Sequence, residues 1–128
     1  MADKILIIDD EENLALFLKR KLELNGQFEV ETASNGKEGL KKAAKISPDL
    51  ILVDIDMPKM NGFEVLKNLK ENKKTTGIPV VMLTGFDDED LKARAASLYN
   101  EGYITKPVEV KELAIKIEEV IGRYRGQL

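Results

Sequence analysis

The sequence contains no histidine, no cysteine and no tryptophan among its 128 residues. Without cysteine, the chain has no disulfides, no thiolate catalysis and no cysteine-ligated zinc. Without histidine, it has no Ser-His-Asp triad, no histidine metal site and no phosphohistidine of its own. Any acid, base or nucleophile must therefore be a carboxylate, a lysine, a tyrosine, a serine or a threonine.

The sequence also lacks a long hydrophobic run and a large excess of charge of one sign. Twenty basic and 23 acidic residues give a formal net charge of -3, so we expect no direct binding to nucleic acid. No apolar run is long enough to span a bilayer, and acids interrupt the opening run "KILIIDDEE" too early for a signal peptide. We therefore expect a cytoplasmic protein with no membrane partner, forming a single domain over residues 1–128.

Short β-branched runs alternate with stretches of helical periodicity. The predicted strands lie within residues 4–9, 28–33, 47–56, 78–85 and 102–105. The predicted helices span residues 13–24, 37–46, 62–72, 87–100 and 110–124. This alternation predicts an α/β fold in which helices cover both faces of a parallel sheet. Ligands of such sheets bind at the carboxyl ends of the strands, which is where a functional site is expected.

Polar side chains follow four of the five predicted strands, and all would reach the same rim of the sheet. These residues are Asp9, Asp10, Asp54, Thr84 and Lys106, and Gly85, next to Thr84, adds a backbone N–H that no side chain blocks. Three carboxylates in one place repel each other, and a hard divalent cation removes that conflict. Oxygen ligands without histidine or cysteine favour Mg²⁺, with Mn²⁺ as the alternative metal.

Asp54 is the candidate nucleophile of this constellation. It follows the buried run "LILV", and an aspartate beside Mg²⁺ is able to accept a phosphoryl group. Lys106, the Thr84 hydroxyl and the Gly85 N–H would stabilise phosphoryl oxygens. Each residue alone also has an ordinary structural interpretation, such as a helix cap, a turn or a solvated lysine. Their joint position, at the ends of different strands, favours phosphoryl chemistry.

Five segments of the chain resemble the receiver domain of two-component response regulators. They are "ILIIDDEE", "ASNGKEGL", "PDLILVDIDMPKMNGFEVL", "IPVVMLTG" and "YITKP". The resemblance covers essentially the whole chain. It implies a flavodoxin-like, doubly wound (βα)5 fold with a five-stranded parallel sheet in the order 2-1-3-4-5. It also implies a single receiver domain with its core at about residues 3–123, and it leaves 124–128 as a short tail, interpreted as the start of a linker.

The resemblance assigns the phosphoryl acceptor and the metal ligands. Asp54 would accept the group from a phosphohistidine on a sensor histidine kinase or a histidine phosphotransfer protein. The chain would then be no enzyme beyond its own phosphorylation and dephosphorylation. Asp9, Asp10, Asp54 and the main-chain carbonyl of Asp56 would bind Mg²⁺, Asp10 more directly than Asp9. The backbone of Asp56 and of Gly85 would also contact the phosphoryl group.

The resemblance further implies a switch. Lys106 would pair with the phosphorylated aspartate, Thr84 would move towards the phosphoryl group, and Tyr103 would then turn inward. The peptide bond before Pro107 would be cis. The changed surface would be the fourth helix, fifth strand and fifth helix, at roughly residues 87–124. A downstream protein or an output domain outside this chain would read it, on a monomer or a phosphorylation-dependent dimer.

The sequence departs from the family pattern at two places, and each departure leads to a hypothesis. Asp56 adds a fourth carboxylate and Phe86 is bulky, so we expect both side chains to tune how water reaches the aspartyl phosphate. The segment before the last strand, "YNEGY", is also unusual. The preceding helix is therefore expected to end differently, with Asn100 or Gly102 in the left-handed conformation.

Two other functions fit parts of the sequence. "LILVDIDMP" matches the apolar run and Asp-x-Asp of haloacid-dehalogenase-type phosphatases, but Asp9 and Asp10 come in the wrong order and no cap domain fits. A receiver fold that binds partners without being phosphorylated is the second alternative. No glycine-rich loop follows the first strand, which disfavours nucleotide or flavin binding.

Overall fold

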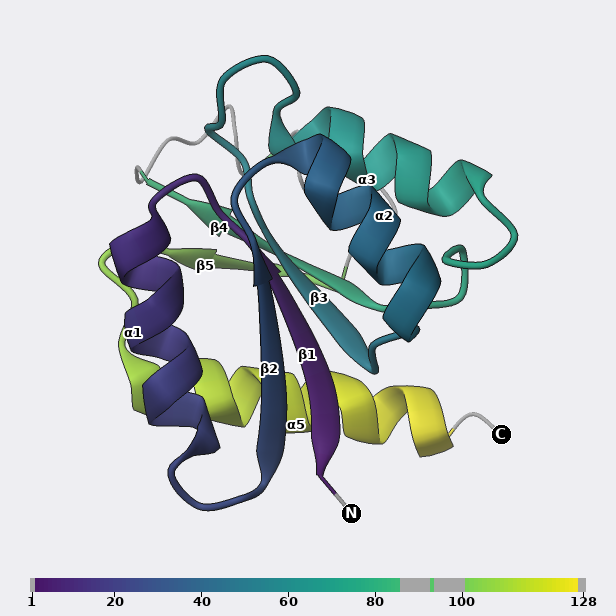
Figure 1. Ribbon diagram of the computed structural model, residues 1–128. Coiled ribbons are helices and arrows are strands. Elements are labelled where there is room, and N and C mark those ends of the chain that lie inside the picture. The colour runs from purple at the N-terminus through teal and green to yellow at the C-terminus, as the bar shows by residue number, and fades with distance from the viewer. Residues whose placement is uncertain (1, 86–92, 94–100, 127–128) are drawn as a thin grey trace.

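The computed structural model describes residues 2–85, 93 and 101–126. Five parallel strands form one sheet in the order β2-β1-β3-β4-β5, which confirms the predicted topology (Figure 1). Their bounds are β1 (Asp3–Ile8), β2 (Phe28–Ala33), β3 (Leu50–Asp54), β4 (Val80–Thr84) and β5 (Tyr103–Thr105). Phe86 and the helix predicted over residues 87–100, except residue 93, lie outside the described residues, so only the β5 and α5 parts of the predicted output surface are described.

Helices pack on both faces of the sheet. On one face lie α1 (Glu12–Glu23) and α5 (Val110–Gly126), and on the other lie α2 (Gly36–Ile46) and α3 (Gly62–Glu71) (Figure 1). The bounds of these helices agree with the predicted ones to within two residues. The architecture is therefore the doubly wound α/β fold that the alternating pattern predicts.

The central strands are apolar throughout because helices cover both of their faces. Ile5 and Ile7 of β1 belong to the core cluster beneath α1 and α5. Leu6 and Ile8 belong to the cluster beneath α2 and α3. All four side chains are fully buried, and each contributes about 1.5–3 kcal/mol by leaving water. The strand ends are consequently firm supports for the residues that follow them.

The turn between β3 and α3 is unusually tight. Asn61 and Glu64 form a reciprocal capping box, in which the Asn61 side chain accepts from the Glu64 N–H (3.0 Å) and the Glu64 side chain accepts from the Asn61 N–H (3.2 Å). The Gly62 N–H donates to the carbonyl oxygen of Ile55 (2.9 Å). A Cβ atom on Gly62 would lie 2.5 Å from the carbonyl oxygen of Asp54, so only glycine fits here.

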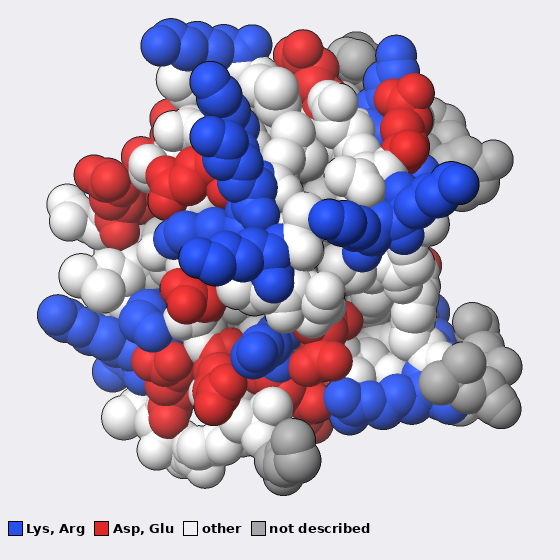
Figure 2. All heavy atoms as spheres, turned by 45° about the vertical axis from the view of Figure 1, so that its right-hand side comes forward, with Lys and Arg blue, Asp and Glu red and all other residues white. Residues whose placement is uncertain are grey.

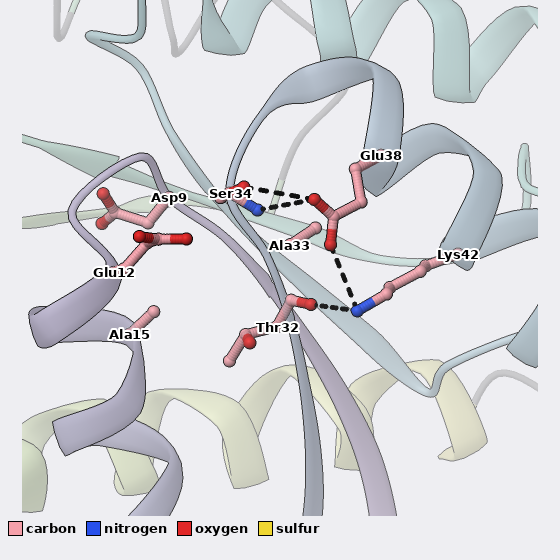
Figure 3. A pocket seen from close by; sticks show the side chains of 8 residues that line it. All are labelled: Asp9, Glu12, Ala15, Thr32, Ala33, Ser34, Glu38 and Lys42. Atoms are coloured by element: carbon pink, nitrogen blue, oxygen red, sulfur yellow. Dashed lines mark hydrogen bonds and ion pairs between the residues drawn. The ribbon is translucent and has the colours of Figure 1, made fainter.

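Side chains from the flanking helices cover the outer edge of β2. Lys19 of α1 donates to the carbonyl oxygen of Val30 (2.7 Å), while Glu23 accepts from the Val30 N–H (3.0 Å). Lys42 of α2 donates to the carbonyl oxygen of Thr32, and it also pairs with Glu38 (Figure 3). These contacts satisfy backbone groups that an edge strand would otherwise leave open.

The C-terminal helix is longer than predicted. Residues 125 and 126 extend α5 beyond the predicted end of the helix at residue 124. Tyr124 packs against the core beneath α1 and α5, and Arg125 pairs with Asp3 at 2.6 Å. These tertiary contacts hold the last turn in place, which helical periodicity alone does not reveal.

Gly102 has a φ of 139°, in the positive range that L side chains rarely adopt. Whether Gly102 or Asn100 ends the preceding helix stays a prediction. The carbonyl oxygen of Gly102 accepts from the Met82 N–H (2.9 Å), which extends the pairing between β4 and β5. Asn100, the other candidate, lies outside the described residues.

The surface carries charges of both signs. Basic and acidic side chains are interspersed over the face shown in Figure 2. Within the described part of the chain, none of the helices combines the length and apolar character needed to cross a bilayer.

Candidate functional site

The carboxyl ends of the central strands bring the predicted polar residues to one rim. Asp9 directly follows β1, and its N–H donates to the carbonyl oxygen of Ala33 (3.0 Å), which continues the pairing with β2. Asp54 is the last residue of β3. Lys106 follows β5, and its N–H donates to the carbonyl oxygen of Thr84 (2.7 Å). The sheet register therefore fixes the backbone of the constellation before any side-chain contact forms.

Lys106 is the cation at the centre of this rim. Its ammonium nitrogen lies 2.8 Å from Glu11 Oε1, 3.1 Å from Asp9 Oδ2 and 3.4 Å from Asp54 Oδ1. The two aspartates are 0% and 2% exposed, so water screens them little. One lysine thus faces three carboxylates, and the site has an excess of negative charge.

The pKa of Asp54 is raised to about 7. Burial is the largest cause because it disfavours the ionised carboxylate, and the nearby charge of Asp9 adds to it. A hydrogen bond with Asp10 raises the pKa further, whereas the Lys106 charge and the Asp56 N–H lower it. In the absence of a metal, Asp54 is therefore only partly ionised near neutral pH.

Lys106 keeps its proton at neutral pH. Burial by itself would lower its pKa, but the contacts with Glu11, Asp9 and Asp54 outweigh burial and raise the pKa of Lys106. The ammonium is thus a permanent positive charge in the site.

The donor atoms at this rim fit a hard divalent cation. Carboxylate oxygens of Asp9, Glu11 and Asp54 lie within 4.8 Å of one another. Although Lys106 is close, the buried Oδ2 atom of Asp9 accepts no hydrogen bond from the part of the chain that the structure describes. Buried polar atoms normally have a partner, and Mg²⁺ is bound by such oxygen atoms.

The carboxylate cluster differs from the predicted set in one member. Glu11 joins Asp9 and Asp54, whereas Asp10 is exposed and acts through its hydrogen bond with Asp54. Glu11 is absent from the predicted set because the run "DDEE" also fits the acidic residues that commonly begin a helix. The signal available in the sequence was the extra acid immediately after the aspartate pair.

An open cleft of about 550 Å³ gives access to Asp54. Its lining consists of Glu11, Leu14, Asp54, Asp56, Gly85, Lys106, Pro107 and Val108. The Asp56 N–H donates to Asp54 Oδ1 at 3.3 Å, while the Asp56 side chain is exposed. Gly85 stands at the exposed rim, and the Lys106–Pro107 bond is cis.

The residues predicted to switch lie next to this cleft. Thr84 is 1% exposed at the end of β4, one residue after Leu83, which is the strand partner of Asp54. Tyr103 is 39% exposed on β5, so its inward turn stays a prediction. The tuning role of Phe86 falls on a residue outside the described ones.

Residues 5–118 match the sequence family described as the response regulator receiver domain. The chain belongs to this family. Receiver domains of response regulators are signalling domains, and response regulators partner with sensor histidine kinases. This membership favours neither a haloacid-dehalogenase-type phosphatase nor a phosphorylation-independent module.

Known regulators and solved receiver structures are similar to this receiver domain. It is 40% identical to the alkaline phosphatase synthesis transcriptional regulatory protein PhoP of Bacillus subtilis, over 96% of this chain and 50% of PhoP. A receiver domain from Clostridium thermocellum has a TM-score of 0.88 at 35% identity, and a CheY-like one from Methanospirillum hungatei has 0.90 at 30%. Both alignments cover 100% of each chain. The receiver domain spans about half the length of PhoP.

Proposed function

We propose that residues 1–128 form one receiver domain that acts as a phosphorylation-activated switch in a two-component system. Asp54 accepts a phosphoryl group from a phosphohistidine on a sensor histidine kinase or a histidine phosphotransfer protein. The observation that carries this proposal is the buried Asp54 carboxylate, which faces an open cleft beside Asp9 and Lys106. The domain catalyses only its own phosphorylation and dephosphorylation.

In the proposed reaction, an Asp54 oxygen attacks the phosphorus atom. A new O–P bond forms while the N–P bond of the phosphohistidine breaks, and the imidazole leaves with that electron pair and takes up a proton from solvent. Lys106 stays charged and pairs with a phosphoryl oxygen, and the Thr84 hydroxyl and the Gly85 N–H donate to the others.

The metal requirement follows from the same donor set. Asp9, Asp10, Asp54 and the main-chain carbonyl of Asp56 would hold Mg²⁺ or Mn²⁺. When bound, the ion supplies positive charge against the carboxylates and the phosphoryl oxygens. The side chains orient the acceptor, and the positive charge of a bound ion would offset the burial and the Asp9 charge that raise the pKa of Asp54.

Phosphorylation of Asp54 changes a surface that another protein or domain recognises. Thr84 and Tyr103 pass the change to a surface over residues 87–124, which a downstream protein or an output domain recognises in the cytoplasm. Asp56 and Phe86 tune the lifetime of the aspartyl phosphate. Asp56→Ala and Phe86→Ala are expected to change the dephosphorylation rate, and equal rates in the variants and the wild type would rule out this tuning.

Intact mass spectrometry tests the central step. After incubation with acetyl phosphate and Mg²⁺, the wild type is expected to gain one phosphoryl group, and EDTA or Asp54→Asn should abolish the gain. Asp49→Asn is the matched control, because Asp49 lies outside the cleft lining. A gain that persists in Asp54→Asn, or no gain once calorimetry has shown Mg²⁺ binding, would contradict the proposal.

A further inference from the structure

Glu11 makes the shortest contact with the central lysine, although its side chain is the most exposed of the three carboxylates. The side chain is 61% exposed, against 0% for Asp9 and 2% for Asp54. The distance to Lys106 Nζ is nevertheless 2.8 Å, and it meets hydrogen-bond geometry. Lys106 is therefore held towards the mouth of the cleft, and it reaches Asp54 only at 3.4 Å.

The backbone around Glu11 directs its side chain to this contact. The Glu11 N–H donates to Asp9 Oδ1 at 2.9 Å, and the Glu11 carbonyl oxygen accepts from the Ala15 N–H at 3.0 Å. Glu11 occupies the N-cap position of α1, yet its side chain makes no capping hydrogen bond. The partner of its carboxylate is instead Lys106, 95 positions further along the chain. Helix capping therefore does not explain this side chain.

We propose that Glu11 is the resting-state counter-ion of Lys106 and competes for it with the phosphorylated Asp54. This inference rests on the proposed function. A phosphoryl group on Asp54 adds negative charge to the cleft and needs Lys106 in direct contact with one of its oxygens. Glu11 must then release the lysine, and its own charge repels the entering anion. Glu11 is thus a positioning residue that sets a threshold for phosphorylation.

Beryllofluoride, which stands in for the phosphoryl group on Asp54, provides the binding test. Calorimetry with beryllofluoride and Mg²⁺ should show about three- to fivefold tighter binding to Glu11→Gln than to the wild type, the scale of one partly exposed ion pair. Glu12→Gln is the matched control, because Glu12 loses the same charge but lines the neighbouring pocket with Asp9 (Figure 3). We expect the control to stay within about twofold of the wild type.

A second measurement tests the ion pair between Glu11 and Lys106 in the unphosphorylated, metal-free protein. The ¹³C resonance of the Glu11 side-chain carboxyl is expected to shift in Lys106→Met and to stay close to its wild-type position in Lys106→Arg. The Glu12 carboxyl resonance should stay unchanged in both variants. If the Glu11 carboxyl resonance keeps its wild-type position in both variants, the inference is wrong, whether or not the domain is phosphorylated.

The remaining outcomes separate this inference from the proposed function. Equal beryllofluoride affinities of Glu11→Gln and Glu12→Gln would overturn the competition. Binding of Mg²⁺ alone that is clearly weaker to Glu11→Gln than to Glu12→Gln would make Glu11 a metal ligand and would also overturn the competition. A wild type that binds Mg²⁺ but no beryllofluoride would refute the proposed function. The proposed competition for Lys106 would then also be wrong. The carboxyl resonances would still show whether Glu11 pairs with Lys106.

Discussion

Asp54→Asn is expected to raise the free energy of unfolding of the metal-free domain at pH 8 by up to about 4 kcal/mol. The substitution removes a buried charge that burial and Asp9 make unfavourable. The pKa of Asp54 is about 7 in the folded protein, against an ordinary value of 3.8. At 1.36 kcal/mol per pKa unit, this difference of about three units gives the stated upper limit.

The sign of the pH dependence follows from the same two values. Between pH 3.8 and 7 the folded state holds a proton on Asp54 that the unfolded state has lost, so the stability of the wild type falls as pH rises through this window. The gain from Asp54→Asn should therefore be about 2–3 kcal/mol smaller at pH 5 than at pH 8. Urea unfolding in EDTA at both pH values measures this difference.

Asp49→Asn is the control for this prediction, because Asp49 does not line the cleft that contains Asp54. An equal gain from Asp54→Asn at pH 5 and pH 8 would show that Asp54 is not the group responsible. Added Mg²⁺ should stabilise the wild type more than Asp54→Asn, since the variant has lost one proposed ligand.

Gly62→Ala is expected to destabilise the domain by about 3 kcal/mol or more and to slow its phosphorylation. The new Cβ atom would lie 2.5 Å from the carbonyl oxygen of Asp54 and 2.7 Å from the Cα atom of Ile55. Both are backbone atoms next to a fully buried strand, so neither can move without shifting Asp54 itself. Urea unfolding gives the stability change, and mass spectrometry gives the phosphorylation rate.

Gly122→Ala is the matched substitution for this test. A Cβ atom on Gly122 would have no heavy atom within 4 Å, and the residue lies inside α5. Alanine favours a helix interior over glycine, so this variant should be more stable than the wild type by about 0.5–1 kcal/mol. If both variants changed stability in the same direction, crowding against Asp54 would not be the cause of the first effect.

The sequence predicts the sheet and its rim well because both depend on local patterns. Continuous apolar runs mark the central strands, and the residues directly after them, Asp9, Asp54 and Lys106, meet because parallel strands share a direction. Lys106 alone has the pattern of a surface lysine. Only its position after a strand, in common with the aspartates, indicates a site.

The sequence does not reveal which residue each side chain contacts. Asp10 and Glu11 are both acids after β1, and no pattern shows which of them reaches Lys106. The choice is made by the hydrogen bond between Asp9 and the Glu11 backbone, which aims Glu11 at the cleft. The last turn of α5 likewise depends on Asp3, which is distant in sequence and pairs with Arg125.

The covered edge of β2 limits how copies of this domain can associate. A sixth strand arriving at that edge would have to displace Lys19 and Lys42 from the backbone carbonyls and Glu23 from the Val30 N–H. It would also bury two ammonium groups against another chain. Fibril growth and strand exchange are therefore disfavoured on this side of the sheet.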